Sequence, residues 1–168
     1  MFNILVPVDG SENALLAVRH TLGLAALRGD TQVHLLNVQP RMNRHAGRFL
    51  SRRSLADAHR ETGCRRLGEA EGLLRAAGVN YRSTVMAGEP SSAAAQYAAD
   101  NGINQIVVGT ARRTSLMRLL AGSFTNELVR LVNVPVAVVA GSRPGVLERI
   151  GVPTGVGIGL TALLLTVD

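Results

Sequence analysis

The sequence contains no lysine and no tryptophan, and it has a single cysteine, Cys64. One cysteine cannot form a disulfide within the chain, and no C-x-x-C spacing surrounds it that would indicate a metal site. The first residues also lack the basic segment and long apolar run of a secretory signal. These absences predict a cytoplasmic protein without a bound metal ion.

Aromatic residues are also scarce, at 3% of the chain, whereas hydrophobic residues make up 46%. The core must therefore consist of Val, Leu, Ile and Ala side chains. That composition favours a sheet buried on both faces by helices, and it disfavours a surface on which successive nucleic-acid bases stack. The length of 168 residues leaves room for one substantial domain.

Arginine is the only basic residue besides histidine. The chain has 18 arginines and 12 acidic residues, which gives a formal net charge of +6. Eight of these arginines lie between Arg41 and Arg66, against only Asp57 and Glu61. We interpret this stretch as a loop that leads into a solvated helix, because charge runs are usually surface features. A polyanion-binding patch is the weaker alternative, and nucleic acid is not an expected partner.

Short apolar runs alternate with stretches of helical periodicity through most of the chain. We predict strands at residues 2–8, 32–38, 79–86, 103–108 and 134–140. We predict helices at 12–27, 56–77 and 123–131, and one that runs from residue 91 or 92 to 99. Such alternation predicts an α/β fold of three layers, with a five-stranded, mostly parallel sheet and helices on both faces. Ligands of these folds bind beyond the carboxyl ends of the strands.

Three segments resemble the universal stress protein family: ILVPVDGSE at 4–12, GEP at 88–90, and VVGTARRTSLMRLLAGSFTNELVRLVNVPVAVV at 107–139. The resemblance spans residues 1–141. It implies an adenine nucleotide alpha hydrolase-like fold with strand order 3-2-1-4-5, and a dimeric, ATP-binding stress-response module. It also implies a homodimer formed through the last strand, Pro135 to Ala140, since so apolar an edge strand is better paired than exposed.

The family's nucleotide-binding members carry a glycine, two residues, a second glycine, nine residues, and then glycine with serine or threonine. In this sequence those positions are Gly109, Arg112 and Gly122-Ser123. The resemblance assigns ATP, with or without Mg²⁺, as the ligand. The residues it implies for the site are Pro7, Val8, Asp9, Val38, Gly88, Gly109, Arg112, Gly122, Ser123, Phe124 and Thr125.

Arg112 departs from the family pattern, in which a glycine lets the loop approach the phosphates closely. Arg112, together with Arg113 and Arg118, replaces backbone contacts by charge-assisted bonds, or else the loop has lost nucleotide binding. In the second case the chain is a nucleotide-free interaction protein that acts through its dimer surface or its tail.

Catalytic residues are not evident. Asp9 is the one acidic residue at a predicted strand end on the binding edge, and no second carboxylate or histidine accompanies it as an acid/base pair. The four histidines show no metal-ligand spacing, and neither the Walker A pattern nor the G-x-G-x-x-G fingerprint is present. We therefore expect no enzyme, although slow hydrolysis of ATP stays open.

Residues 142–168 form an apolar, glycine-rich tail beyond the resemblance. Its stretch from Ile150 to Val167 has no charged residue, but it barely reaches the roughly 18 to 20 residues that span a bilayer. Glycines, threonines and a proline weaken the case further. Contact with a membrane is therefore less favoured than a packed hairpin, helix or partner-covering segment.

Overall fold

The computed structural model describes residues 1–39, 52–110 and 124–140, and side chains from residue 61 onward in the helix that begins at Arg52. Nine elements alternate along these residues: β1 (Phe2–Pro7), α1 (Glu12–Arg28), β2 (Thr31–Gln39), α2 (Arg52–Ala76), β3 (Asn80–Ala87), α3 (Pro90–Asp100), β4 (Gln105–Thr110), α5 (Phe124–Leu131) and β5 (Val136–Ala140). The predicted alternation is confirmed, with boundaries that differ by a few residues. The tail at 142–168 lies outside the described residues.

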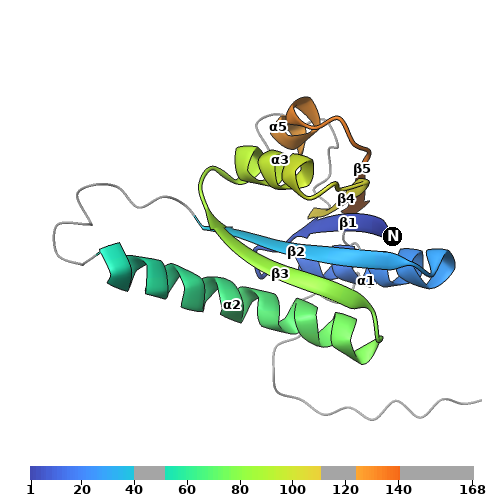
Figure 1. Ribbon diagram of the computed structural model, residues 1–168, viewed down its shortest axis with the longest axis horizontal. Coiled ribbons are helices and arrows are strands. Elements are labelled where there is room, and N and C mark those ends of the chain that lie inside the picture. The colour runs from blue at the N-terminus through green and yellow to red at the C-terminus, as the bar shows by residue number, and fades with distance from the viewer. Residues whose placement is uncertain (40–51, 111–123, 141–168) are drawn as a thin grey trace, which may run out of the picture.

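The five strands form one parallel sheet in the order β3-β2-β1-β4-β5 (Figure 1). This confirms the predicted strand order. β1 shares six register pairs with β2, from Phe2 with Thr31 to Pro7 with Leu36. With β4 it shares two, Ile4 with Gln105 and Leu5 with Ile106. The strand order reverses direction between β1 and β4.

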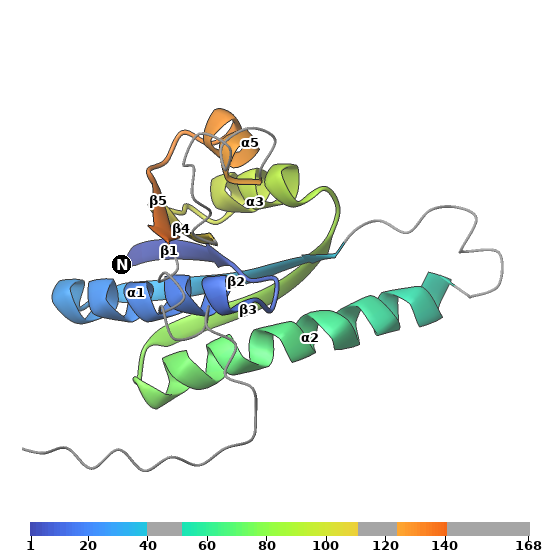
Figure 2. The same cartoon turned by 180° about the vertical axis from the view of Figure 1, so that it is seen from behind.

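Helices cover both faces of the sheet, as predicted: α1 and α2 lie on one face, and α3 and α5 lie on the other (Figures 1 and 2). Alternate residues of β1 supply the two cores, because successive side chains of a strand point to opposite faces. Ile4 and Val6 join the core under α1 and α2, whereas Leu5 joins the core under α3 and α5. All three are completely buried.

Two helix starts are fixed by side-chain caps. Ser11 Oγ accepts a hydrogen bond from Ala14 N at 3.2 Å and so caps α1. Glu89 caps α3, because its carboxylate accepts from Ser92 N at 2.7 Å and from Ser91 N at 3.0 Å. We predicted that this helix begins at Ser91 or Ser92, but the structure begins it at Pro90, a residue that suits a first helical position.

The second helix is longer than predicted, since α2 begins at Arg52 and not near residue 56. Arginine is a good helix former, so the basic stretch extends the helix. Gly63 brings α2 close to the sheet: a Cβ at this position would lie 2.6 Å from Val85 Cγ2 on β3. Gly68 on the same helix has open space around it.

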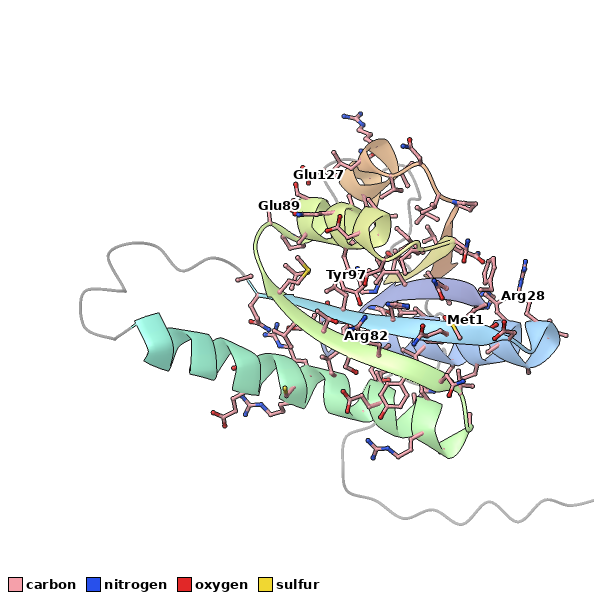
Figure 3. The ribbon with its side chains drawn as sticks, in the orientation of Figure 1. Met1, Arg28, Arg82, Glu89, Tyr97 and Glu127 are labelled. Carbon is pink, nitrogen blue, oxygen red and sulfur yellow. The ribbon has the colours of Figure 1, made fainter. Side chains whose placement is uncertain are left out.

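A buried polar cluster joins β2, β3 and α3. His34 Nδ1 lies 3.0 Å from the Tyr97 hydroxyl, which lies 3.3 Å from Thr84 Oγ1. Figure 3 labels Tyr97, which belongs to this cluster, and the nearby Arg82. His34 is 3% exposed, and its burial, followed by the nearby charge of Arg82, lowers the pKa of the imidazole. The ring is therefore held neutral at physiological pH.

No helix within the described ranges 1–39, 52–110 and 124–140 is long and apolar enough to cross a membrane.

Candidate functional site

A cavity of about 430 Å³ opens at the carboxyl edge of the sheet, where β1 and β4 diverge. Crevices at this point of a parallel sheet are the usual ligand sites of such folds, and the volume is typical of small-molecule pockets. Its lining residues come from β1, β2 and β4, from the loop between β1 and α1, and from the first turns of three helices. They are Pro7, Val8, Asp9, Ser11, Asn13, Ala14, Leu36, Val38, Pro90, Val108, Gly109, Thr110, Phe124 and Thr125.

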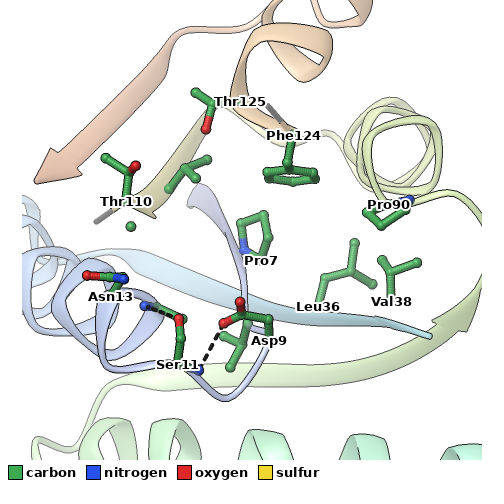
Figure 4. A pocket seen from close by; sticks show the side chains of 14 residues that line it. Pro7, Asp9, Ser11, Asn13, Leu36, Val38, Pro90, Thr110, Phe124 and Thr125 are labelled. Carbon is green, nitrogen blue, oxygen red and sulfur yellow. Dashed lines mark hydrogen bonds between the residues drawn. The ribbon is translucent and has the colours of Figure 1, made fainter. Parts of the chain in front are cut away.

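The loop after β1 holds a carboxylate at the cavity. Asp9 Oδ1 accepts a hydrogen bond from Ser11 N at 2.9 Å (Figure 4). Gly10 between them has a φ of 87°, a conformation that favours glycine. Ser11 in turn caps α1, so the positive end of that helix also lies at the cavity. Asp9 is exposed.

A buried amide supports this loop from below. Asn37 Nδ2 on β2 donates to the Val8 carbonyl oxygen at 2.6 Å, and Gln39 Nε2 donates to Asn37 Oδ1. Asn37 is completely buried, and Gln39 is 5% exposed. Because unpaired polar groups are costly to bury, these bonds fix the backbone just before Asp9. Neither residue is among those that the sequence indicates for the site.

Gly109 is required by packing between protein segments. A Cβ on Gly109, near the end of β4, would overlap the backbone carbonyl of Asn13 in the first turn of α1. We predicted that this glycine lets the backbone approach a ligand. It lines the cavity, but the close neighbour in the structure is helix α1.

The cavity has an apolar side and a polar side (Figure 4). The apolar side consists of Pro7, Leu36, Val38, Pro90 and Phe124, and the polar side of Ser11, Asn13, Thr110 and Thr125. Asp9 lies between them in the view of Figure 4. A ligand with a flat apolar end and a polar or anionic end matches this division.

Helices α3 and α5, which both begin at the cavity, are joined by a serine. Ser91 Oγ lies 2.8 Å from Glu127 Oε2 on α5 and 3.0 Å from Glu89 Oε1 (Figure 3). Ser91 is 1% exposed. The backbone bonds from Ser92 and Ser91 lower the pKa of Glu89 to about 2, so this carboxylate is ionised near neutral pH. The hydroxyl therefore ties the start of α5 to the start of α3.

Seven of the residues implied by the resemblance lie together at this cavity: Pro7, Val8, Asp9, Val38, Gly109, Phe124 and Thr125. Gly88 does not line it, and Pro90, two residues later, does. Arg112, Gly122 and Ser123 lie outside the described residues. Position along the strands could have pointed to Leu36 and Thr110, because Leu36 is two residues before Val38 and Thr110 ends β4.

Among the residues that the structure describes, no group of three His, Cys, Asp or Glu side chains is placed to hold a metal ion. Asp9 is the acidic residue among those that line the cavity. General acid/base catalysis usually needs a second titratable group within reach.

Comparison with known proteins gives one consistent family. Residues 1–140 match the model of the universal stress protein family. The universal stress protein MJ0531 of Methanocaldococcus jannaschii is 27% identical over 139 residues, which cover 81% of this chain and 80% of that protein.

Solved structures agree with this match. The structure of MJ0577, also from Methanocaldococcus jannaschii, has a TM-score of 0.68 at 25% identity and covers 84% of this chain and 97% of that one. A universal stress protein family member from Arabidopsis thaliana, solved with AMP bound, has a TM-score of 0.64 at 18% identity and covers 88% and 99%. At that identity the second similarity concerns the fold.

Proposed function

This chain belongs to the universal stress protein family, and we propose that it is a nucleotide-binding stress-response module whose ligand is an adenine nucleotide, ATP or AMP. The cavity between β1 and β4 is the observation that carries the proposal. Residues that the family resemblance implies lie together there, beside the first turns of three helices and between an apolar and a polar wall. The AMP bound to the Arabidopsis relative supports the same ligand class.

Each part of the nucleotide has a matching part of the cavity. The base fits the apolar side, and the Asp9 carboxylate can accept hydrogen bonds from ribose hydroxyls, which are good donors to an ionised oxygen. The phosphates fit near the starts of α1 and α5, where backbone N–H groups and the helix dipoles favour anions. If Mg²⁺ accompanies ATP, the phosphate oxygens supply most of its ligands.

The role that we propose is binding and signalling without a metabolic reaction, in the cytoplasm. A nucleotide acts in such a module by stabilising one form of the protein that a partner recognises. The Asp9 carboxylate could orient a water molecule near bound phosphates. Release of phosphate from ATP should therefore be assayed together with binding.

A homodimer through β5 belongs to the proposal. β5 lies at one edge of the sheet, and Val138 on it is 49% exposed. An apolar edge strand is prone to pair with another strand, and a two-fold axis lets it pair with itself. Sedimentation of the wild type and of Val138→Arg tests this pairing: a dimer converted to a monomer supports it, and an unchanged mass contradicts it.

A nucleotide-free interaction protein is the second candidate. It is favoured by Arg112 at a motif position that calls for glycine, and the exposed β5 edge would supply its interaction surface. Absence of nucleotide binding together with an intact dimer would select this candidate.

Calorimetric titration with AMP and with ATP, in the presence and absence of Mg²⁺, tests the proposed ligand. We expect saturable binding at one site per chain. Asp9→Ala should weaken binding about tenfold or more, because a charge-assisted hydrogen bond is lost. Asp100→Ala, an exposed carboxylate at the end of α3 and absent from the cavity lining, is the matched control and should bind as the wild type does.

A further inference from the structure

The loop between α3 and β4 contains Asn101-Gly102, which is the one Asn-Gly pair in the sequence. Such a pair is prone to deamidation, because glycine has no side chain to hinder the approach of its backbone nitrogen. In this reaction the Gly102 nitrogen bonds to Asn101 Cγ and gives up its proton, the Cγ–Nδ2 bond breaks, and ammonia leaves. Water then opens the succinimide ring to give aspartate or isoaspartate.

The folded backbone holds the reacting atoms apart. Asn101 ends α3 with a φ of −111° and a ψ of 13°, and at this ψ the Gly102 nitrogen is turned away from the Asn101 side chain. The ring closes only after rotation about the Cα–C bond of Asn101. The side-chain amide is held as well, since Asn101 Nδ2 donates a hydrogen bond to the Tyr97 carbonyl oxygen at 2.9 Å.

Asn3, at the start of β1, holds the same loop from the neighbouring strand. Its Nδ2 donates to the carbonyl oxygens of Gly102, at 3.2 Å, and Asn101, at 3.4 Å. The Asn101 carbonyl turns when ψ changes, so ring closure breaks that bond. The backbone of Asn3 adds two bonds to Asn104: Asn3 N donates to Asn104 Oδ1 at 2.8 Å, and Asn104 N donates to Asn3 O at 2.9 Å. The loop therefore reaches the reactive conformation only when it leaves β1.

Water has access to this loop in the folded protein. Gly102 is exposed and Asn101 is half-buried, so the hydrogen bonds restrain the reaction by fixing the conformation and not by excluding water. We propose that Asn101-Gly102 is a modification site, at which the chain deamidates spontaneously once Asn3 releases the loop. Water is the one co-reactant, and the site lies at the amino ends of β1 and β4, away from the cavity.

The product differs from the starting chain in charge and in hydrogen bonding. A carboxylate at position 101 has no N–H to donate to the Tyr97 carbonyl oxygen. It also places a negative charge at the C-terminal end of α3, where the helix dipole favours cations. Deamidation thus weakens the end of α3, and each modified chain keeps a permanent record that this loop has opened.

Mass spectrometry of the tryptic peptide 83–112 follows the reaction, because an acid is heavier than the amide it replaces. The full-length chain is incubated folded and in guanidinium chloride at the same pH and temperature. We expect slower conversion of Asn101 in the folded wild type than in the unfolded chain. Asn104, in the same peptide but followed by Gln105, is the internal reference and should stay largely unmodified.

Asn3→Ala tests the restraint directly. It should speed the conversion of Asn101 in the folded protein about tenfold, in line with the loss of one or two hydrogen bonds. The rate in guanidinium chloride should not change, because position 3 is far from position 101 in the unfolded chain.

Ile4→Val is the matched control for stability. Ile4 is the next residue of β1 and is completely buried, so its truncation lowers the melting temperature and keeps the hydrogen bonds of Asn3. Well below that temperature it should deamidate at the wild-type rate. Equal rates in the folded and unfolded wild type would show that the fold gives no protection. Equal acceleration by Asn3→Ala and Ile4→Val would assign the protection to global stability and overturn the role of Asn3.

Discussion

The backbone carbonyl of Asn13, in the first turn of α1, occupies the space that a side chain at Gly109 on β4 would need. The two residues also line the same cavity. The tight contact between α1 and β4 therefore contributes to the shape of the site. It also requires a residue without a side chain at position 109.

Gly109→Ala should destabilise the protein by about 1–3 kcal/mol or more, because the added methyl group meets backbone that cannot rotate away. Urea unfolding checks this. Gly88→Ala is the control, since a Cβ there meets Ala93 Cβ at an ordinary 3.7 Å and the residue does not line the cavity. Equal stability of the two variants would contradict the assigned contact.

Helix α2 offers a pair of glycines with opposite expectations. Gly63→Ala should cost about 1–3 kcal/mol, since its Cβ would crowd both methyl groups of Val85, at 2.6 and 2.7 Å. Gly68→Ala has open space and should stabilise the helix by about 0.5–1 kcal/mol through helix propensity. Thermal and urea unfolding of both variants should move in opposite directions. Movement in the same direction would mean that α2 packs on the sheet differently.

The Ser91 hydroxyl should matter both for stability and for the site. Ser91→Ala removes the 2.8 Å link to Glu127, at a cost of about 1 kcal/mol. It should also weaken AMP binding several-fold, because α5 begins with two residues that line the cavity. Ser92→Ala is the control, because Ser92 is exposed and its backbone N–H can still donate to Glu89 after the substitution. AMP affinity that is equal in both variants would rule out the positioning role.

Stability should fall with acid through His34. Its pKa is lowered in the folded protein, so below the ordinary value near 6.5 the unfolded chain binds a proton that the folded chain refuses. The loss therefore begins near pH 6.5 and grows until the lowered pKa of the folded state is reached. Above pH 6.5 this group has no effect.

Urea unfolding between pH 8 and pH 5 measures this dependence. His34→Gln should flatten the curve in that range, because the titrating ring is gone. His20→Gln, at an exposed position on α1, should leave the slope as in the wild type. A wild-type slope that survives in His34→Gln would assign the acid sensitivity to other groups.

The sequence was informative where local patterns decide the outcome. Alternating strands and helices predicted the layers, and the family resemblance predicted the order β3-β2-β1-β4-β5. The predicted boundaries are less accurate where a side chain caps a helix. The Glu89 carboxylate caps α3, which begins one or two residues earlier than expected. The predicted start of α2 near residue 56 is too late, because the charge of the arginine-rich stretch does not show its helix propensity.

The site could be predicted only in part, because some of its support comes from residues far apart in sequence. Asn37 and Gln39 gave no signal, since an amide in a strand reveals its partner only after the strands are paired. The contact of Gly109 with Asn13 likewise depends on how α1 crosses β4. Arg112, Gly122 and Ser123, on which the phosphate assignment rests, stay predictions.

The pairing of β1 with β4 has a mechanical consequence. Two register pairs join these strands, against six between β1 and β2 and five between β4 and β5. The sheet is therefore least extensively paired between β1 and β4. The cavity lies beyond the carboxyl ends of these two strands and is lined by residues from both. A ligand bound there would contact both halves of the sheet. The melting temperature should therefore rise as the fraction of protein with bound ligand increases.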